Sequence, residues 1–572
     1  MRHTNIENTY KLKLQIAEIL KEKSEHLNVD IIIASYFLYK TYEYTKNDCL
    51  YKNLLKNKNF IDEDVLYSFK ENITEPVWNE LIKLTLYNPA ENFLHIIFSP
   101  ISSGFKYADS FTPKSVIELS QKILNCKPNE KVADIGCGIG SFIISAAEIE
   151  PNAYFDGYEI NVRYKVVSSI RSELLKNKNV NVYLKNAFQI PDTKKYDKIF
   201  SNYPFGMRLK DLGEGIKYID DLSAKYSGIT RTTSSDWIFN ALLCSKLEEN
   251  GKAVAIMTNG SAWNRIDMPL RKYFIEQGLV EAVIALPERM FDYTPIQTSL
   301  IILSKNNTSV RLIDASNLCK QERRQNVFTK DNIEAIYDAL KRNSEFSKDI
   351  SLQQLRDNEY TLNLRRYLSS NEINFKNGVP FESVIKNITR GAPLTASQLD
   401  QMSSNKITNI QYLMLNNIQN GLICNNLPYL TSIENKYEKY CLKNNNLIIS
   451  KIGFPYKVAV ANIEDGHTIL ANGNLYIIEL DETKVKPYFL KAFFESEKGI
   501  SVLNNITVGA SIPSIGIDDL KRIIIPLPSM EEQEQISLKY QATLDEISIL
   551  NIRLEKAVNK LYHIFDSESE EL

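Results

Sequence analysis

Paired cysteines and clustered histidines are absent from this sequence. Its seven cysteines are scattered, none belongs to a C-x-x-C pair, and its five histidines are isolated from one another. Zinc sites and disulfide frameworks need such residues in groups. We therefore expect no disulfide framework and no metal site, and we interpret the histidines as ordinary surface or core side chains.

Long apolar runs are also missing. A stretch such as "VDIIIASYFLY" is well short of the roughly 20 residues that a membrane-spanning helix needs. The first residues, "MRHTNIENTYKLK", lack the continuous apolar region of a secretory signal. We therefore expect no membrane span and a cytoplasmic location.

Neither sign of charge is in excess. The 68 Lys and Arg residues almost balance the 70 Asp and Glu residues, for a net charge of −2. This balance argues neither for nor against nucleic acid, so any DNA-binding surface would have to be local. The sequence also has no G-x-x-x-x-G-K-[ST] loop, and no nuclease or helicase motif is visible.

The length and the changes of pattern along the chain predict several domains. At 572 residues the chain is too long for one core, so about two to four domains are expected. We divide it into an N-terminal helical domain (1–100), an α/β domain (101–310), a helical connector (311–372), an α+β domain (373–528) and a long amphipathic helix with an acidic tail (529–572).

The second region alternates between apolar strand-like runs and helical segments. Strands are predicted at "KVADIG", "YFDGYEI", "YDKIFSN", "GKAVAIMTN", "VEAVIALP" and "TSLIILSK", and helices at segments such as "SVIELSQKIL" and "SDWIFNALLCSKLEE". Such alternation predicts a parallel or mostly parallel α/β sheet.

A glycine-rich loop follows the first of these strands. In "VADIGCGIGSF" the strand ends near Asp134, and Gly136, Gly138 and Gly140 then allow a sharp turn and a close approach to a ligand. The next strand ends in Glu159, about 20 residues further on, where a carboxylate can accept hydrogen bonds from a ribose. A nicotinamide-binding fold would share these features, and Glu159 could also be a solvated acid at a strand end.

A second polar turn follows a later strand of the same sheet. In "KIFSNYPFGM" the strand runs into Asn202, Tyr203, Pro204 and Phe205. Ligands of open α/β sheets bind at the carboxyl ends of the strands. This turn is therefore expected to face the nucleotide held by the glycine loop.

In this order, the glycine loop, the ribose acid and the Asn-x-Pro-aromatic turn resemble the amino-methyltransferases that use S-adenosylmethionine, whose turn usually reads Asn-Pro-Pro-Phe or Asp-Pro-Pro-Tyr. The resemblance narrows to the modification subunits of type I restriction-modification systems. It rests on "FKYADSFTPKSVIELSQKIL", on "DWIFNALLCSKLEENGKAVAIMTNGSAW", on "LRKYFIEQGLVEAVIALPERMFDYTPIQTSLIILSK" and on "RDNEYTLNLRRYL".

The C-terminal third is similar to the specificity subunit of the same systems. "FESVIKNITRGAPLT" resembles the start of a target-recognition domain, and "GNLYIIELDETKVKPYFLKAFFESEKG" with "VGASIPSIGIDDLKRIIIPLPSMEEQEQI" resembles its end. One recognition domain and one long helix are present, whereas a full specificity subunit has two of each. The resemblance therefore implies a modification subunit fused to half of a specificity subunit, a chain that modifies and does not cut.

This resemblance implies a Rossmann-like methyltransferase domain that transfers a methyl group from S-adenosylmethionine to N6 of a flipped adenine. The Asn202 side chain and the Tyr203 carbonyl would accept the two amine hydrogens, next to Pro204, and Phe205 would stack on the base. The cofactor-binding residues it implies are Phe111, Thr112, Pro113, Asp134, Gly136, Gly138, Gly140, Glu159 and Asn186. The implied partner is double-stranded DNA, and the resemblance also allows a homodimer and a separate restriction subunit.

Two residues depart from the usual motifs and leave alternatives open. Tyr203 stands where the turn usually has a proline, so the fixed φ of proline is lost, and Asn186 stands where an Asp is usual. A weak enzyme or an inactive DNA-binding relic is the alternative. Enzymes that methylate a protein glutamine or an RNA base share the turn, but they would leave the C-terminal region unexplained.

The last helix carries an apolar stripe with separations of three and four residues. Its members are Ile536, Tyr540, Leu544, Ile547, Leu550, Leu554, Val558, Leu561 and Phe565. The stripe could pack onto the chain's own methyltransferase domain or N-terminal helices. Alternatively, two chains could pair these helices antiparallel and form a dimer that reads an interrupted palindrome.

Overall fold

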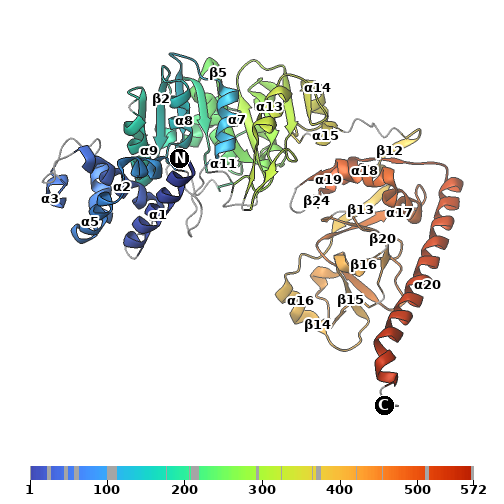
Figure 1. Cartoon of the computed structure of the whole chain (residues 1–572). Coiled ribbons are helices and arrows are strands. Elements are labelled where there is room, and N and C mark those ends of the chain that lie inside the picture. Colours follow the sequence, from blue (N-terminus) through green and yellow to red (C-terminus); the bar gives the residue numbers. More distant parts are fainter. Residues whose placement is uncertain are drawn as a thin grey trace. The chain divides into compact units, whose positions relative to one another are not determined.

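The structure is a computed structural model of the chain. It describes residues 2–21, 27–43, 49–56, 63–99, 112–175, 177–204, 206–207, 218–291, 296–323, 325–363, 365–368, 375–419, 421–424, 426–453, 455–508 and 514–568. The chain forms two compact units, Met1–Leu368 and Ser369–Leu572 (Figure 1). Each unit is described by itself below.

Helices form the N-terminal part of the first unit, as expected. They are α1 (Arg2–Leu20), α2 (Leu27–Lys40), α3 (Tyr51–Leu54), α4 (Glu63–Asn72), α5 (Glu75–Leu81) and α6 (Ala90–Phe98). α2 is buried on all sides, with Ile31, Tyr36 and Leu38 in the core, because it lies between α1, α4, α6 and α9 (Val162–Leu175). A helix that is apolar all round is stable only in such a position.

A nine-stranded, mostly parallel sheet forms the centre of the first unit, in the order β11-β8-β6-β7-β5-β4-β1-β2-β3. The strands are β1 (Lys131–Ile135), β2 (Tyr154–Glu159), β3 (Val180–Leu184), β4 (Tyr196–Ser201), β5 (Leu247–Thr258), β6 (Val280–Ala285), β7 (Thr298–Leu303), β8 (Ser309–Asp314) and β11 (Ser347–Ser351). The predicted α/β fold class is confirmed. β7 runs antiparallel to both of its neighbours. The described part of the connection from β6 to β7 contains no helix, and a parallel neighbour would need a crossover.

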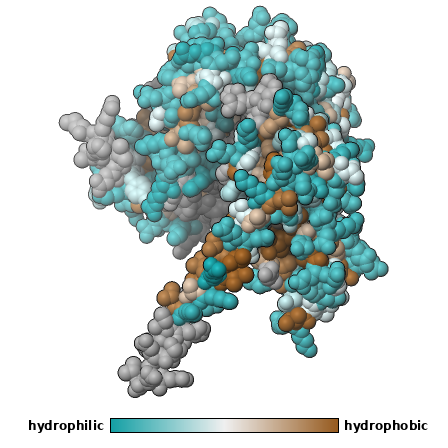
Figure 2. All heavy atoms as spheres, turned by 90° about the vertical axis from the view of Figure 1, so that its right-hand side faces the viewer, coloured by the Kyte–Doolittle hydropathy of each residue, from teal (hydrophilic) through white to brown (hydrophobic). Residues whose placement is uncertain are grey.

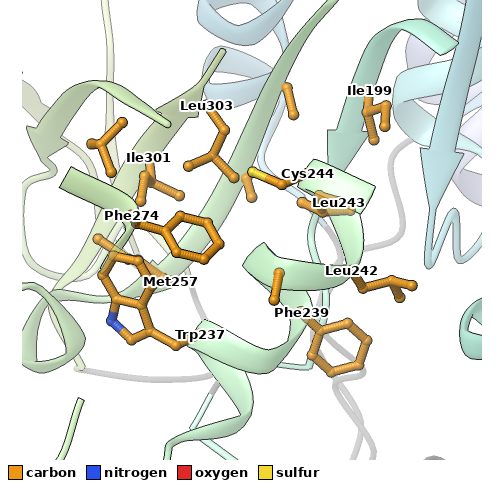
Figure 3. Close-up of a cluster of buried hydrophobic side chains, with 14 of the residues drawn as sticks. Ile199, Trp237, Phe239, Leu242, Leu243, Cys244, Met257, Phe274, Ile301 and Leu303 are labelled. Atoms are coloured by element: carbon orange, nitrogen blue, oxygen red, sulfur yellow. The ribbon is translucent and has the colours of Figure 1, made fainter. Parts of the chain in front are cut away.

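Helices cover both faces of this sheet (Figure 1). They are α7 (Lys114–Leu124), α8 (Ser141–Ile149), α9, α10 (Ile219–Lys225), α11 (Ser235–Lys246), α12 (Met268–Glu276), α13 (Lys330–Ala339), α14 (Leu352–Asp357) and α15 (Arg365–Leu368). Successive residues of β1, Val132 and Ala133, belong to different core clusters. In one of these clusters, Trp237 of α11 packs near Phe274 and Met257 (Figure 3). Burial on both faces explains the almost continuous apolar runs of the strands.

The segment expected to be a helical connector contributes to the sheet as well. Within 311–372, α13, α14 and α15 are helical, but most of β8 and all of β11 lie there and extend the sheet at one edge. β11 reads "SKDIS", and only Ser347 and Ile350 of its residues are buried. A polar edge strand gives little hydrophobic signal, which is why the sequence suggested helix alone. The domain boundaries drawn from the sequence remain predictions.

The second unit has the predicted α+β character. Its strands are β12 (Gly378–Pro380), β13 (Ile385–Arg390), β14 (Ser403–Ser404), β15 (Ile410–Leu413), β16 (Ile418–Gln419), β17 (Leu422–Ile423), β18 (Tyr429–Leu430), β19 (Leu447–Ser450), β20 (Val458–Val460), β21 (Thr468–Ala471), β22 (Leu475–Leu480), β23 (Thr507–Val508), β24 (Ser514–Ile515) and β25 (Ile524–Pro526). Its helices are α16 (Ala396–Met402), α17 (Pro487–Glu495), α18 (Glu497–Asn505), α19 (Ile517–Arg522) and α20 (Met530–Glu568). The larger sheets have the orders β13-β22-β19-β20 and β14-β18-β15-β21.

Among the described side chains of α20, those in the first part of the helix pack against the rest of its unit. Tyr540 donates a hydrogen bond to Glu495 of α17, and the Lys491 ammonium lies 3.1 Å from the Tyr540 hydroxyl. Of the predicted stripe, Leu544 is buried, Tyr540 and Ile547 are half-buried, and Ile536, Leu550, Leu554, Val558 and Leu561 are exposed. The Phe565 side chain lies outside the described residues. Apolar side chains are visible along this helix in Figure 2. Nowhere in the described part of the chain is a helix both long enough and apolar enough to cross a membrane.

Candidate active site at the carboxyl edge of the sheet

The glycine loop between β1 and α8 has a backbone that favours glycine at three positions. Gly136, Gly138 and Gly140 have φ values of +75°, +54° and +78°. A Cβ atom at Gly140 would lie 3.1 Å from Oγ of Ser168. Side chains at these positions would therefore be strained, and at Gly140 also crowded.

Glu159, the last residue of β2, is bonded to this loop. Its Oε2 accepts a 2.8 Å hydrogen bond from the Gly138 N–H, and its Oε1 accepts one of 2.7 Å from the Asn161 N–H. Burial raises the pKa of Glu159, although these two N–H groups favour its charged form. Each carboxylate oxygen has a second lone pair, so the group can still accept hydrogen bonds from a ligand.

Asp134, near the end of β1, is only 2% exposed. Burial raises its pKa to about 8, the Ile143 N–H opposes the shift, and the negative charge of Glu159 adds to it. A cationic ligand placed nearby would favour the ionised form of this carboxyl group. Two neighbouring acids with raised pKa values therefore mark this edge as a site suited to positive charge.

The Asn202 turn lies against the glycine loop. A Cβ atom at Gly136 would be 3.9 Å from both the Asn202 carbonyl oxygen and Cα of Tyr203. Nδ2 of Asn202 donates a 2.9 Å hydrogen bond to Oγ1 of Thr112, which fixes the orientation of this buried amide. Pro204 is exposed. Phe205 lies outside the described residues.

Tyr203 is turned into the protein instead of toward the ligand edge. It is 1% exposed, and its hydroxyl donates a 3.0 Å hydrogen bond to Oδ1 of Asn240. Its ring stacks on Phe239, with centroids 4.8 Å apart and an interplanar angle of 9°. The sequence suggested only that this residue loses the restraint of a proline, whereas the structure anchors it through its side chain.

A small cavity joins the loop and the turn. Its volume is about 20 Å³, and it is lined by Thr112, Asp134, Gly136, Cys137, Gly138, Ile139, Ser141, Phe142, Phe200 and Asn202. This volume holds about one water molecule, so a nucleotide would have to lie mainly along the open sheet edge.

The other residues expected to bind the cofactor lie outside this lining. Pro113 precedes α7 as its N-cap, and Oδ1 of Asn186 accepts a hydrogen bond of 3.0 Å from the Phe188 N–H, which caps a short 3₁₀ helix after β3. Phe111 lies outside the described residues. Among the described residues, no group of three or more His, Cys, Asp or Glu side chains could hold a metal ion.

Two buried charged residues near the site were not found from the sequence. Arg171 donates hydrogen bonds to the carbonyls of Ile97, Ile139 and Ser99, so it ties the glycine loop to the N-terminal helices. Asp236 accepts a 2.8 Å hydrogen bond from the N–H of Gly206 in the Asn202 turn. A charged residue inside an otherwise apolar helical segment, as in "SDWIFNALL", was the available signal.

Comparison with known families covers most of the chain. Residues 102–375 match the family described as N-6 DNA Methylase. Residues 393–560 match the family described as type I restriction modification DNA specificity domain. The two matches do not overlap and follow the order expected from the sequence.

Individual relatives match about half of the chain. The chain is 27% identical over 302 residues to the type I restriction enzyme MjaVIII methylase subunit of Methanocaldococcus jannaschii, with 48% of this chain and 51% of that protein covered. It is 23% identical over 311 residues to the type I restriction enzyme MpnII methylase subunit of Mycoplasma pneumoniae, with 50% and 57% covered. The chain thus spans about half the length of these curated relatives.

A likeness to a solved structure extends over both units. The structure of the DrdV–DNA complex matches with a TM-score of 0.55 and 10% identity, over 94% of this chain and 72% of that chain. At this identity the likeness is one of fold. From the two family matches, the chain carries an N-6 DNA methylase domain followed by a type I restriction modification DNA specificity domain.

Proposed function

We propose that the chain is a site-specific DNA methyltransferase that transfers a methyl group from S-adenosylmethionine to N6 of adenine. The observation that carries this proposal is the contact between the Asn202 turn and the glycine loop at the carboxyl edge of the sheet, in a chain that also has a specificity domain. The first element supplies acceptors for an amine, and the second supplies a cradle for a nucleotide.

The residues at the sheet edge fit S-adenosylmethionine, which would supply an electrophilic methyl group on a positively charged sulfur. The loop of Gly136, Gly138 and Gly140 lets the backbone approach the ligand, and Glu159 can accept hydrogen bonds from its ribose. Asp134 adds a buried carboxyl group whose ionised form a positive ligand would favour. Phe111, Thr112, Pro113 and Asn186 complete the proposed cofactor site.

Methyl transfer to adenine requires that the N6 amine become a better nucleophile. The Asn202 Oδ1 and the Tyr203 carbonyl would accept its two hydrogens, so that its lone pair is no longer held in conjugation with the ring. Acceptors fixed before the reaction stabilise the positive charge that develops on the nitrogen. No general base is needed for this step, and the geometry of the turn supplies the proximity.

The adenine has to leave the duplex to reach this site. Base flipping costs a few kcal/mol, and stacking on an aromatic ring offsets part of that cost. Phe205 is the proposed stacking partner, worth about 1–3 kcal/mol. The specificity domain would read the sequence through contacts to base edges, and Lys and Arg side chains would bind phosphates without regard to sequence.

Replacing Asn202 tests this function directly. Asn202→Ala should abolish methyl transfer to unmethylated genomic DNA and leave S-adenosylmethionine binding nearly intact, because only an acceptor for the target amine is removed. Phe205→Ala should reduce transfer less severely. Tritium incorporation measures the transfer, and calorimetry measures the binding.

Three results would contradict the proposal. Unchanged turnover of Asn202→Ala would remove the assigned role of this residue. A wild-type protein that is stabilised by NAD and not by S-adenosylmethionine in a thermal-shift assay would instead indicate a nicotinamide enzyme. A protein that binds S-adenosylmethionine and DNA without any transfer would be the inactive relic.

A further inference from the structure

One face of α11 contacts the Asn202 turn at two points. Asp236, Phe239 and Asn240 are three and four residues apart, so they lie on the same side of the helix. All three side chains are buried. Figure 3 shows Phe239 projecting from α11 on a different side from Trp237, which packs with Phe274 in the core.

The first contact holds the residue before Pro204. Phe239 stacks on the Tyr203 ring at 4.8 Å, and Oδ1 of Asn240 accepts the hydrogen bond from the Tyr203 hydroxyl at 3.0 Å. Burial raises the pKa of Tyr203 well above its ordinary value, so the hydroxyl remains a donor at any physiological pH. Withdrawal of the ring would leave Oδ1 of Asn240 without this hydrogen bond.

The second contact holds the residues after Pro204. Oδ1 of Asp236 accepts the hydrogen bond from the Gly206 N–H at 2.8 Å. Its Oδ2 accepts hydrogen bonds from the Thr258 N–H at 2.9 Å, the Thr258 hydroxyl at 2.7 Å and the Ser261 hydroxyl at 2.8 Å. Both oxygens of this buried carboxylate are therefore hydrogen-bonded, with one donor on Oδ1 and three donors converging on Oδ2.

α11 is itself fixed at its start. The Ser234 N–H donates a 2.7 Å hydrogen bond to Oδ1 of Asp267, and Nε1 of Trp237 donates one of 2.9 Å to the Ser261 carbonyl. The helix therefore cannot move independently of the segment after β5. Residues of the turn that are bonded to α11 are therefore also held in place relative to the segment after β5.

We propose that α11 is a clamp that positions the catalytic turn, with Asp236 and Asn240 as positioning residues on either side of Pro204 and Phe205. In this chain the clamp replaces the backbone restraint that a proline at position 203 would give. The inference rests on the proposed methyl transfer, because it explains how the Tyr203 carbonyl and Asn202 stay aimed at the amine. Neither positioning residue touches the substrate.

A pair of matched variants tests the first contact. Tyr203 follows the end of β4, and Tyr196 begins the same strand. Tyr196 is also 1% exposed, and its hydroxyl donates a 2.9 Å hydrogen bond to Oδ2 of Asp156. Tyr203→Phe and Tyr196→Phe each remove one buried hydroxyl, so both should lower the melting temperature. Tyr203→Phe alone should lower kcat, by about tenfold or more, with unchanged affinity for S-adenosylmethionine.

Asp236→Asn tests the second contact. An amide has one acceptor oxygen, and three of the four donors converge on Oδ2. The asparagine oxygen should face those three donors and leave its NH₂ group against the Gly206 N–H. The turn would then lose its anchor, so kcat should fall by about 100-fold and the Gly206 amide should exchange its hydrogen faster than in the wild type.

Two measurements, kcat and the hydrogen exchange of the Gly206 amide, separate this proposal from the function on which it rests. If folded Tyr203→Phe and Asp236→Asn keep the wild-type kcat, the clamp has no role in positioning. If Tyr196→Phe loses as much kcat as Tyr203→Phe, the effect is general destabilisation and the proposal is wrong. If the wild type transfers no methyl group, the proposed function fails, while hydrogen exchange at Gly206 still decides whether Asp236 holds the turn.

Discussion

Asp134 and Glu159 place two carboxyl groups in one small region with little access to water. Burial raises the pKa of both, to about 8 for Asp134. An isolated buried charge is expensive, so Asp134 favours its neutral form in the free protein. Near neutral pH, ionising Asp134 in the free protein costs free energy. A positively charged ligand bound next to Asp134 would stabilise the ionised form, so binding of such a ligand would be linked to loss of the Asp134 proton.

This linkage gives a pH dependence with a definite sign. Asp134 has a pKa near 3.9 in the unfolded chain and about 8 in the folded protein, so the folded state binds more protons between these values. Stability should therefore fall as pH rises from about 4 to 8. Affinity for S-adenosylmethionine should rise over pH 6 to 8, with proton uptake by the buffer.

Asp134→Asn provides the control for this prediction. The variant keeps the size of the side chain and removes the titration, so both pH profiles should become flatter. Calorimetry in two buffers of different ionisation enthalpy measures the proton release. Equal proton release by the wild type and the variant would show that another group is responsible.

At the scale of the secondary-structure elements, the two parts of α20 differ in how far their apolar side chains are buried. Its first part packs on α17, whereas Leu550, Leu554, Val558 and Leu561 are exposed although they continue the same apolar stripe. Apolar residues in a row on an exposed helix are typical of an interface. Antiparallel pairing with the same helix of a second copy stays one prediction for this face, and packing onto the chain's own methyltransferase domain or N-terminal helices is the alternative.

A charge placed on the stripe tests this pairing. Leu554 is 62% exposed and lies on the stripe, and Leu538 is 59% exposed and lies off it. Leu554→Glu should split a dimer into monomers, and Leu538→Glu should leave it intact, because only the first places a charge in the paired face. Light scattering on the DNA-bound protein measures the mass.

The symmetry of the methylated sequence is an independent readout of the same prediction. Two paired chains would read an interrupted palindrome and methylate both strands. A single asymmetric site together with the mass of one chain would eliminate the dimer.

For the whole molecule, the two compact units allow the proposed methyl transfer and the proposed sequence reading to be tested separately. The methylase family match extends over 102–375, and the specificity match begins at 393. The first unit ends at Leu368 with its own core clusters. Each proposed activity can therefore be tested on residues that fold around their own interior.

Deleting residues 373–572 should leave a domain that binds S-adenosylmethionine and no longer selects a DNA sequence. Base-edge contacts give specificity, and the deleted part would supply them. Sequencing of modified adenine in DNA exposed to the truncated and the full-length protein measures the result. Retention of the same methylated motif by the truncated protein would contradict this division of roles.

The sequence alone determined the elements with strong local signals. The apolar runs before Asp134 and Asn202, the spacing of the three glycines and the position of Glu159 were enough to predict an α/β sheet with two loops at one edge. These signals are local because glycine conformation and strand burial depend on neighbouring residues. Polar edge strands such as β11 gave no such signal, and they were missed.

Only the tertiary structure decided how those loops are held. Thr112 and Asn202 are far apart in the sequence, yet they share a hydrogen bond, and the α11 residues Asp236 and Asn240 hold the turn after β4. The sequence indicated that Tyr203 loses the restraint of a proline, and its burial against α11 became visible only in the fold. Hydrogen bonds between distant segments depend on which residues the packing of helices on the sheet brings together, and the periodic pattern of one segment does not identify its partner in another.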